Sequence, residues 1–376
     1  MPRRLKIAFV LDTAGGVRAG GLVAGQRIIE ELRHDHDVVS VGLGGDIALQ
    51  PLELPIARDL IASNSVAFAR PDDDLLARAF DRADVVHVQL PFFLGFRALA
   101  LAHELGVPVV AAHHFQPENV LANVALIAPR IGRAVNPRQF VRTFNRVLTR
   151  TFYNRAEALI CPSRLAYEEL RDAGLRTPAE IISNGAPDWF APLPSRPPHP
   201  FTVLTVGRLV PEKRHDVVVA AVCRSRHASA MRLVIAGQGP CRAALERQAR
   251  DCPAQVELGF QPDEALLRLY QTADLYVHAS EAELEGMAAL EAMRCGCPSV
   301  LCDSPSSATR QFALGPAHLF PSGDPQALAD RIDDWFEHPD RLERERDRTL
   351  EAVRDYGLSH TIEAYEALYQ RVASPH

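Results

Sequence analysis

Residues 201–214 read FTVLTVGRLVPEKR, and the interpretation of the whole chain starts from this stretch. Its first six residues are apolar or β-branched, which is typical of a buried strand. Gly207 and Arg208 follow at once, and Lys213 comes after a short turn. Ligands of open α/β sheets bind at the carboxyl ends of the strands. A guanidinium fork and an ammonium at that edge indicate a diphosphate site, whereas in isolation they would be solvated loop charges.

The rest of the chain repeats this rhythm of short apolar runs, each followed by helical periodicity. Before residue 187 the runs are LKIAFVLD, HDVVSVGL, ADVVHVQL, VPVVAAHH, AEALICPS and AEIISNG. After residue 200 they are FTVLTVGRL, MRLVIAGQG, AQVELGF, ADLYVHAS and CPSVLCD. Strands that alternate with helices predict parallel sheets covered by helices, the α/β class. The sequence therefore predicts two Rossmann-like domains.

The boundary between these domains is predicted from length and proline content. A chain of 376 residues is long enough for two hydrophobic cores. Residues 187–200 contain six prolines, which fit neither a helix nor a central strand. We therefore assign residues 1–186 to an N-terminal domain, 187–200 to a linker and 201–357 to a C-terminal domain. The periodicity of residues 358–376 predicts a last helix that can cross back to the N-terminal domain.

Composition narrows the classes of function. The formal net charge of -6, with 47% hydrophobic and 23% charged residues, is that of an ordinary globular protein without a general attraction to nucleic acid. No apolar run approaches the ~20 residues that span a bilayer, so we expect at most peripheral membrane contact. The seven cysteines lack paired CxxC spacing, which favours reduced thiols, a cytoplasmic location and no metal. We expect no cofactor.

A second polar loop follows the run ADLYVHAS. Residues 283–293 read ELEGMAALEAM, and Gly286 precedes the helical part. A glycine at a helix start allows close approach of a ligand, and the free N–H groups favour phosphate or sugar oxygens. Glu283 and Glu291 are acceptors for sugar hydroxyls. The simpler explanation is that Glu283 is a charge at the helix start and that Glu291 lies on a solvated face of the helix. However, Glu291 stands among apolar residues, where an unpaired carboxylate is costly.

Together these motifs resemble those of the retaining GT-B glycosyltransferases of family four, also called glycosyl transferases group 1. The resemblance covers nearly the whole chain and rests on Gly207-Arg208-Leu209, Glu212-Lys213, Glu283 and Glu291 with their E-x7-E spacing, Ser183-Asn184-Gly185, and IAGQGP at 235–240. It implies a GT-B fold, two Rossmann-like domains facing across a cleft. It also implies transfer of a sugar from a nucleoside diphosphate to an acceptor hydroxyl with retention of configuration.

The resemblance also gives the motif residues their roles. Arg208 and Lys213 would hold the donor diphosphate and stabilise the charge that develops on it. Glu291 would contact the nucleotide ribose, and Glu283 would contact the transferred sugar. No side chain in the motifs is an obvious nucleophile, so the family is pictured as attacking from the same face, with the departing phosphate helping to take the acceptor proton.

One departure from the family concerns the donor pocket. The family usually has E-G-F-G where residues 283–286 of this chain are ELEG. Gly286 is the matching glycine and, with Gly207, is expected to lie against the donor. The change leaves the donor open between a UDP-glucose-like and a GDP-mannose-like sugar nucleotide.

The first domain offers further candidates for the donor site. Gly20 and Gly21, next to the helical pattern GLVAGQRIIEEL, match the family's glycine-rich loop best. Gly15-Gly16 is the other candidate for this glycine-rich loop. The alternative to a ligand-binding loop is a purely structural turn. After the run VPVVAA, His114 matches the family's sugar-contacting histidine better than His113 does.

Two other signals are interpreted as structural. His87, within DVVHVQL, is more often a structural histidine than part of a site. Asp72-Asp73-Asp74 has the D-x-D spacing of metal-dependent transferases, but it follows Pro71 and precedes LLARAFDRA. That position favours a helix start with capping and dipole roles over a metal site.

The acceptor is predicted from a local excess of positive charge. Residues 119–156 contain no Asp or Glu but seven arginines: Arg130, Arg133, Arg138, Arg142, Arg146, Arg150 and Arg155. Apolar residues share this segment, as in helices that lie on an anionic lipid surface. Some enzymes of the resembled family glycosylate lipids such as diacylglycerol, so we expect a peripheral enzyme with a lipid-linked acceptor. A core-packed helix with a solvated basic face is the alternative.

Other functions of the same fold stay open at this point. A soluble acceptor, a sugar-nucleotide epimerase and a non-catalytic nucleotide- or glycan-binding module are the alternatives. A phosphorylase would need a pyridoxal-phosphate lysine, for which the sequence has no recognisable site. The joint presence of Arg208, Lys213, Glu283, Glu291 and His114 favours a catalytic protein.

Overall fold

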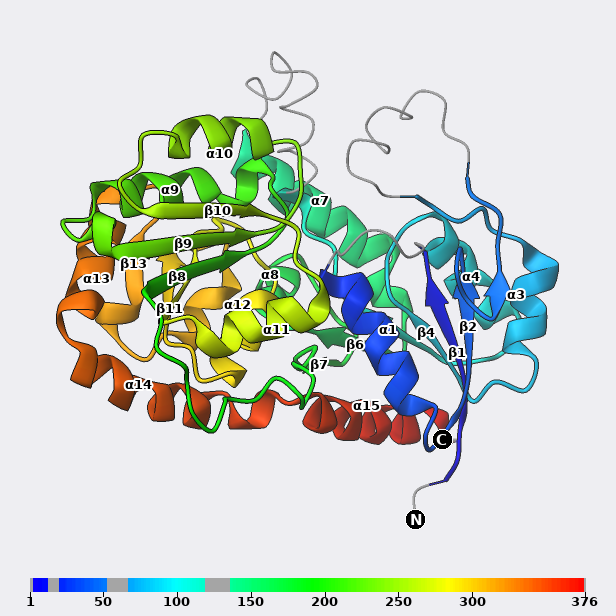
Figure 1. Ribbon diagram of the computed structural model, residues 1–376. Coiled ribbons are helices and arrows are strands. Elements are labelled where there is room, and N and C mark those ends of the chain that lie inside the picture. The colour runs from blue at the N-terminus through cyan, green and yellow to red at the C-terminus, as the bar shows by residue number, and fades with distance from the viewer. Residues whose placement is uncertain (1–2, 13–19, 53–66, 119–135, 375–376) are drawn as a thin grey trace. The chain divides into compact units, whose positions relative to one another are not determined.

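A computed structural model describes residues 3–12, 20–52, 67–118 and 136–374 of the protein (Figure 1). The chain divides into two compact units, one of residues 1–184 with 360–376 and the other of residues 185–359. Each unit is built on one sheet whose strands all pair in parallel, with helices between successive strands. The predicted α/β class is therefore confirmed.

The sheet of the first unit has the strand order β3-β2-β1-β4-β5-β6-β7. Its strands are β1 (Lys6–Leu11), β2 (Asp37–Gly42), β3 (Ile47–Ala48), β4 (Val85–Val88), β5 (Val109–Ala112), β6 (Ala158–Cys161) and β7 (Ala179–Ile181). The described helices are α1 (Gly20–Leu32), α3 (Asp73–Phe80), α4 (Phe93–Glu104), α7 (Pro137–Thr151) and α8 (Arg164–Asp172). Strands β4, β5 and β6 are buried along their whole length, as parallel strands covered on both faces must be.

The sheet of the second unit has the order β10-β9-β8-β11-β12-β13. Its strands are β8 (Phe201–Val206), β9 (Met231–Ala236), β10 (Gln255–Gly259), β11 (Leu275–His278), β12 (Ser299–Asp303) and β13 (Leu319–Pro321). The α-helices are α9 (His215–Arg224), α10 (Arg242–Ala249), α11 (Asp263–Thr272), α12 (Met287–Arg294), α13 (Pro325–Glu337) and α14 (Pro339–Ala352). Strands β8 and β11 are neighbours, so the loops after them leave the same edge of the sheet.

The apolar side chains of β8 point alternately to the two faces of this sheet. Val203 belongs to a buried cluster that includes residues of α9, α10 and α13. Leu204 belongs to a second cluster, with residues of α11 and α12. In Figure 1, α9 and α10 accordingly lie on one side of the strands, and α11 and α12 on the other. Helices α9 and α12 both begin at the carboxyl edge of the sheet, where the two polar loops of the sequence also lie.

The proline-rich segment begins inside the second unit. Residues 185–200 belong to this unit, and the N–H of Ala186 donates to the carbonyl oxygen of Tyr356 at 2.9 Å. Phe190 is buried, with its ring centroid 5.7 Å from that of Tyr270. Five of the six prolines thus follow Phe190, which is packed against α11.

The last helix, α15 (Leu358–Ala373), continues into the first unit from His360 onward. Its Tyr369 hydroxyl lies 2.9 Å from Nδ1 of His87, and Nε2 of His87 lies 2.9 Å from Oε1 of Gln89. The His87 ring also stacks on Phe9 of β1, with the centroids 4.1 Å apart. His87 therefore has the structural role that the sequence favoured.

Helices α9 and α10 are joined covalently. Cys223, near the end of α9, forms a disulfide with Cys252, which follows α10, and their Cα atoms are 4.9 Å apart. The sequence had favoured reduced thiols throughout. The sequence does not predict this pairing, because the two cysteines are 29 positions apart along the chain and only the packing of α9 on α10 brings them together.

Candidate active site

The loop after β8 carries the first pair of candidate residues. The N–H groups of Gly207 and Leu209 donate to the carbonyl oxygens of Ala236 and Gln238, at 3.1 and 2.8 Å. The two backbones approach so closely that a Cβ at Gly237 would overlap the carbonyl oxygen of Gly207. This packing fixes the start of the loop, and the side chain of Arg208, the next residue, remains 29% exposed.

Arg208 and Lys213 are separated by a tight turn. A single 3-10 turn, Pro211–Lys213, follows Val210, and the Arg208 guanidinium lies 3.6 Å from the carboxylate of Glu212. Glu212 is largely buried, so this carboxylate restrains the guanidinium from the protein side. The exposed part of the fork remains available to a phosphate, as an anion site requires.

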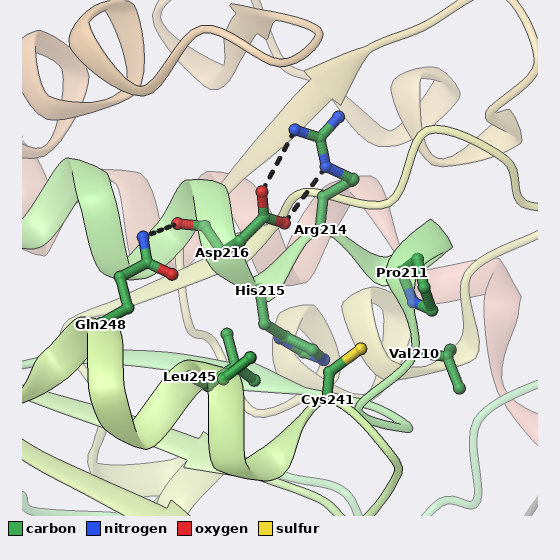
Figure 2. A pocket seen from close by; sticks show the side chains of 9 residues that line it. Val210, Pro211, Arg214, His215, Asp216, Cys241, Leu245 and Gln248 are labelled. Atoms are coloured by element: carbon green, nitrogen blue, oxygen red, sulfur yellow. Dashed lines mark hydrogen bonds and ion pairs between the residues drawn. The ribbon is translucent and has the colours of Figure 1, made fainter. Parts of the chain in front are cut away.

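Arg214 ends the turn in a strained conformation and is held by two carboxylates. Its φ of 50° is left-handed, which is unusual for a residue with a Cβ. Its guanidinium pairs with Asp216 at 3.1 Å, as Figure 2 shows. It also pairs with the carboxylate of Glu281. Arg214 and Asp216 also line a cavity of about 260 Å³ with Cys241, Leu245 and other residues. These ion pairs stabilise the backbone turn that presents Lys213.

The loop after β11 brings the second set of candidates to the first. The ammonium of Lys213 pairs with Oε1 of Glu283, and Nε2 of His278 lies 2.9 Å from the same oxygen. Burial by itself would raise the pKa of the Glu283 carboxyl, but Lys213 and His278 outweigh it and hold this pKa well below its ordinary value. Glu283 is therefore an ionised carboxylate at neutral pH.

Backbone contacts lock this loop in place. The N–H of Glu281 donates to the carbonyl oxygen of Glu212 at 3.3 Å, and the Ser280 hydroxyl donates to the same oxygen at 3.2 Å. On its other side, the N–H of Glu283 donates to Ser306 at 3.1 Å, and the carbonyl of Glu283 accepts from Ala308 at 2.8 Å. The two polar loops thus form one connected structure.

Gly286 is required where helix α12 begins. Its φ is 96°, and a Cβ there would overlap Cγ2 of Thr309. No side chain caps this helix start within the described chain, and the first N–H groups of an α-helix have no acceptor within the helix. This arrangement provides backbone donors for anionic or hydroxyl oxygens.

Glu291 lies one helical turn and a half farther along α12 and is buried. Only 9% of the residue is exposed, and its Oε2 accepts a hydrogen bond of 3.1 Å from the Tyr270 hydroxyl. We expect a carboxylate among apolar residues to have a partner, and Tyr270 of α11 is that partner. The sequence analysis does not single out this tyrosine. The pKa of Tyr270 lies well above its ordinary value because of burial and the nearby Glu291 charge, so the hydroxyl keeps its proton.

The first unit places its own candidates together at the carboxyl edge of its sheet. Gly20 is the first residue of α1, and a Cβ at Gly21 would lie 3.1 Å from Cβ of His114. The carbonyl oxygen of Gly21 also accepts a 3.0 Å hydrogen bond from the side chain of Gln89. The rival Gly15-Gly16 lies outside the described residues.

The two adjacent histidines after β5 have different surroundings. His113 is fully buried, and its Nδ1 lies 2.8 Å from the Tyr153 hydroxyl. His114 is partly exposed, although its Nε2 is buried. Among the described residues, neither its Nε2 nor that of His113 has a hydrogen-bond partner. Burial lowers the pKa of His113 to about 3 and that of His114 to about 4, so both are neutral at pH 7. A neutral imidazole with a free nitrogen suits a sugar hydroxyl.

The acidic triplet starts a helix, as its position indicated. Asp72 is the N-cap of α3 and accepts a 3.0 Å hydrogen bond from the N–H of Leu75. Asp73 pairs with Arg97 at 2.7 Å. Asp72 therefore has a capping role at this helix start, and Asp73 has an ion-pair role.

The arginine-rich segment continues as helix α7. Arg138, Arg142, Arg146 and Arg150 are exposed at intervals of four residues, so they form one stripe along it. None of the four has a hydrogen-bond or ion-pair partner among the described residues. Arg130 and Arg133 lie outside the described part of the chain. On the other side of α7, Leu148 is buried, and the Phe144 ring lies 5.3 Å from that of Phe115.

The structure adds residues that sequence reasoning missed. Besides Tyr270, they are His278 and Tyr276 of β11, whose side chains lie 3.0 Å apart, and the Arg214–Glu281 pair. His278 is the last residue of its strand, so the strand-end rule that selected Arg208 could also have selected it. Tyr270 and Tyr276 gave no such signal, because buried tyrosines are ordinary core residues.

Comparisons with known proteins identify the family of the chain. Residues 27–188 match the family described as Glycosyltransferase Family 4, and residues 193–354 match Glycosyl transferases group 1. The α-monoglucosyldiacylglycerol synthase of Streptococcus pneumoniae is 26% identical over 63% of this chain and 58% of its own length. The chain thus spans less than two thirds of that relative. A GDP-mannose-dependent α-mannosyltransferase of Corynebacterium glutamicum is 25% identical over 98% of this chain and 91% of its own.

A solved structure shows the same fold. The Anabaena protein HepE, crystallised with UDP and glucose, superposes with a TM-score of 0.73 at 17% identity, over 98% of this chain and all of its own. Structural neighbours of this kind are GT-B glycosyltransferases, which confirms the predicted fold class. With both family matches and the motif residues placed at one sheet edge, the chain belongs to family 4 of the GT-B glycosyltransferases.

Proposed function

We propose that this glycosyltransferase moves a hexosyl group from a UDP-glucose-like or GDP-mannose-like donor to an acceptor hydroxyl with retention of configuration. The observation that carries the proposal is the convergence of Lys213, Glu283 and the start of α12 at one carboxyl edge, beside Arg208. Relatives named for glucosyl and for GDP-mannose-dependent mannosyl transfer support the two donor classes.

The leaving group in this reaction is the nucleoside diphosphate. When the bond between the sugar C1 and the phosphate oxygen breaks, negative charge grows on that oxygen. Arg208 and Lys213 lie on a loop whose backbone is already fixed by hydrogen bonds, so only their side chains have to move to stabilise this charge. The free N–H groups at Gly286 add donors on the opposite loop.

The environments of Glu283 and Glu291 support the assignment of one to the transferred sugar and the other to the ribose. Glu283 is an ionised acceptor at the partly exposed end of the site, where it can accept from hydroxyls of the transferred sugar. Glu291 is more deeply buried and oriented by Tyr270, which suits a fixed contact with the ribose hydroxyls. His114 of the first unit is our candidate for a further contact with the transferred sugar.

Retention is proposed to proceed by attack on the same face. The acceptor oxygen bonds to C1 while the bond from C1 to the phosphate oxygen breaks, and the acceptor proton passes to that departing oxygen. Glu283 is a poor candidate for a covalent nucleophile because hydrogen bonds from Lys213 and His278 to its Oε1 withdraw negative charge from the carboxylate.

For the acceptor we propose a lipid at an anionic membrane surface, reached through the stripe Arg138, Arg142, Arg146 and Arg150, with Arg130 and Arg133 contributing. The exposed guanidinium groups on α7 and the glycolipid named for the Streptococcus pneumoniae relative support this choice. Among the described residues, no helix is long and apolar enough to cross a membrane. The proposed location is the cytoplasmic face of the membrane, with reversible attachment. A soluble acceptor is the alternative.

The donor is identified by thermal unfolding with a panel of UDP-, GDP- and ADP-sugars. A ligand that binds only the folded protein at 100 times its Kd stabilises it by about 2.7 kcal/mol. The stabilising donor is then incubated with diacylglycerol vesicles or soluble sugars, and release of nucleoside diphosphate and the anomeric configuration of the product are measured. Stabilisation without turnover on any acceptor would indicate a binding module, and an altered sugar without transfer would indicate an epimerase.

A further inference from the structure

A buried histidine lies directly behind the candidate sugar-binding carboxylate. His278 is 4% exposed, and its Nε2 is 2.9 Å from Oε1 of Glu283. An ionised carboxylate only accepts hydrogen bonds, so Nε2 must carry the hydrogen of this contact. In a neutral imidazole the other nitrogen, Nδ1, is then an acceptor.

Tyr276 provides the hydrogen that Nδ1 requires. Its hydroxyl lies 3.0 Å from Nδ1 of His278, and the two residues stand on the same face of β11 because they are two positions apart. Burial, and then the charge of Glu283, raise the pKa of Tyr276 well above its ordinary value, so the hydroxyl remains protonated. In the neutral imidazole, the Tyr276 hydroxyl therefore donates to Nδ1 and fixes the tautomer that donates to Glu283.

His278 and Lys213 hold the same carboxylate oxygen in different ways. Lys213 reaches Glu283 from a loop, through a flexible chain that is 21% exposed, and we assign its ammonium to the donor diphosphate. His278 is a strand residue whose side chain is only 5% exposed. When a diphosphate draws Lys213 away, His278 still binds Oε1. The orientation of Glu283 in the occupied site then depends on the histidine.

We propose that His278, kept in one tautomer by Tyr276, is a positioning residue that orients the carboxylate of Glu283 toward the transferred sugar. The inference rests on the proposed function, because it needs Glu283 to contact that sugar. It adds two residues to the site, neither of which is expected to touch the donor. The role differs from simple core packing, which would require the shape of His278 but not its Nε2 hydrogen.

The test compares His278→Leu, His278→Gln, Tyr276→Phe and Glu283→Gln, with the double variant His278→Leu/Glu283→Gln. The Gln amide restores a donor near the place of Nε2, whereas Leu keeps apolar bulk and removes both nitrogens. The matched control is His318→Leu. His318 is another histidine with 4% exposure in the same unit, 3.0 Å from Glu345, and outside the candidate site.

Two quantities are measured for each variant with the stabilising sugar nucleotide: kcat/KM, and the ratio of the Kd of the nucleoside diphosphate to that of the sugar nucleotide. His278→Leu removes a hydrogen bond to a charged group, so we expect its kcat/KM to fall by roughly 10- to 100-fold. We expect the Kd ratio to fall as well, partial recovery in His278→Gln, and a loss of only about threefold in Tyr276→Phe, which keeps the Nε2 donor but frees its tautomer. His318→Leu lowers the unfolding temperature but leaves both quantities unchanged.

The double variant separates positioning from structural damage. If His278 acts through Glu283, the double variant is no worse than Glu283→Gln alone, because the second change removes a contact that is already lost. The proposal would be overturned if the losses in kcat/KM of the two single variants multiply in the double variant. It would also be overturned if His278→Leu weakens the binding of nucleoside diphosphate and of sugar nucleotide equally. If Glu283→Gln itself leaves turnover unchanged, the proposed function of the site fails instead, and the two failures are distinguished.

Discussion

Lys213 and Glu283 form an ion pair that joins the loop after β8 to the loop after β11. The ammonium that we assign to the donor phosphates is thus neutralised by the carboxylate that we assign to the transferred sugar. A donor that binds must exchange this internal pair for two contacts of its own, one to its phosphate and one to its sugar. The pair therefore keeps both groups oriented before the donor arrives, and its replacement favours ligands that carry both.

We expect Arg208→Ala and Lys213→Ala each to lower kcat by about 100-fold or more, because each removes a fixed positive charge at the developing oxyanion. Steady-state release of nucleoside diphosphate measures the loss. Arg242→Ala is the control. Arg242 is an exposed arginine of the same unit, and among the described residues its partners are Glu246 and the carbonyl oxygen of Leu258. Near-normal turnover in both site variants would exclude the assigned phosphate site.

The depressed pKa of Glu283 predicts a pH-dependent contribution to stability. The folded protein binds the proton of this carboxyl more weakly than the unfolded chain does. Its stabilising effect is therefore complete above the ordinary glutamate pKa of about 4.3 and is lost as the pH falls below it. The difference in free energy of unfolding between wild type and Glu283→Gln should be larger at pH 7 than at pH 3.5. A difference that does not change between these pH values would contradict the assigned ion pair.

Glu291→Ala should weaken binding of the nucleoside diphosphate itself, whereas Glu283→Gln should mainly reduce transfer. Tyr270→Phe removes only the hydroxyl that donates to Glu291 and should produce a smaller loss of affinity in the same direction. Calorimetric titration with the nucleoside diphosphate measures all three. If Glu291→Ala binds the nucleotide as tightly as wild type does, the ribose contact is wrongly assigned.

His114→Ala should lose far more activity per folded molecule than His113→Ala. The reverse order is expected for stability, because His113 is fully buried and bonded to Tyr153, so its removal leaves a cavity and an unpaired hydroxyl. Thermal unfolding and turnover, measured on the same preparations, separate the two effects. Equal losses of activity in the two variants would show that the assignment of the sugar contact to His114 rather than His113 is wrong.

Replacing Arg138, Arg142 and Arg146 together by glutamine should abolish binding to anionic vesicles. Each arginine near such a surface contributes about 1 kcal/mol, and added salt screens the attraction. Arg224, Arg247 and Arg250, which are exposed in the second unit, provide the matched triple-glutamine control. Co-sedimentation with anionic and neutral vesicles at low and high salt measures binding. Wild-type protein that stays in solution with anionic vesicles at low salt would point to a soluble acceptor.

The sequence by itself determined the fold class and the identity of the main candidate residues. Apolar runs of strand length that alternate with helical periods permit little besides parallel sheets covered by helices. Polar residues at the ends of such runs must gather at one edge, so Arg208, Lys213 and Glu283 were predictable. The helix start at Asp72 was also predictable, because an N-cap depends only on residues close in sequence.

Tertiary structure alone decided which groups pair. Lys213 and Glu283 are 70 residues apart, Arg214 and Glu281 are 67 apart, and Cys223 and Cys252 are 29 apart. Their contacts depend on strand order and helix packing, which local patterns do not encode. The supporting roles of His278, Tyr276 and Tyr270 were hidden for a related reason. A buried polar residue has the same sequence signature whether it packs a core or orients a site, and only the position of its partner separates the two.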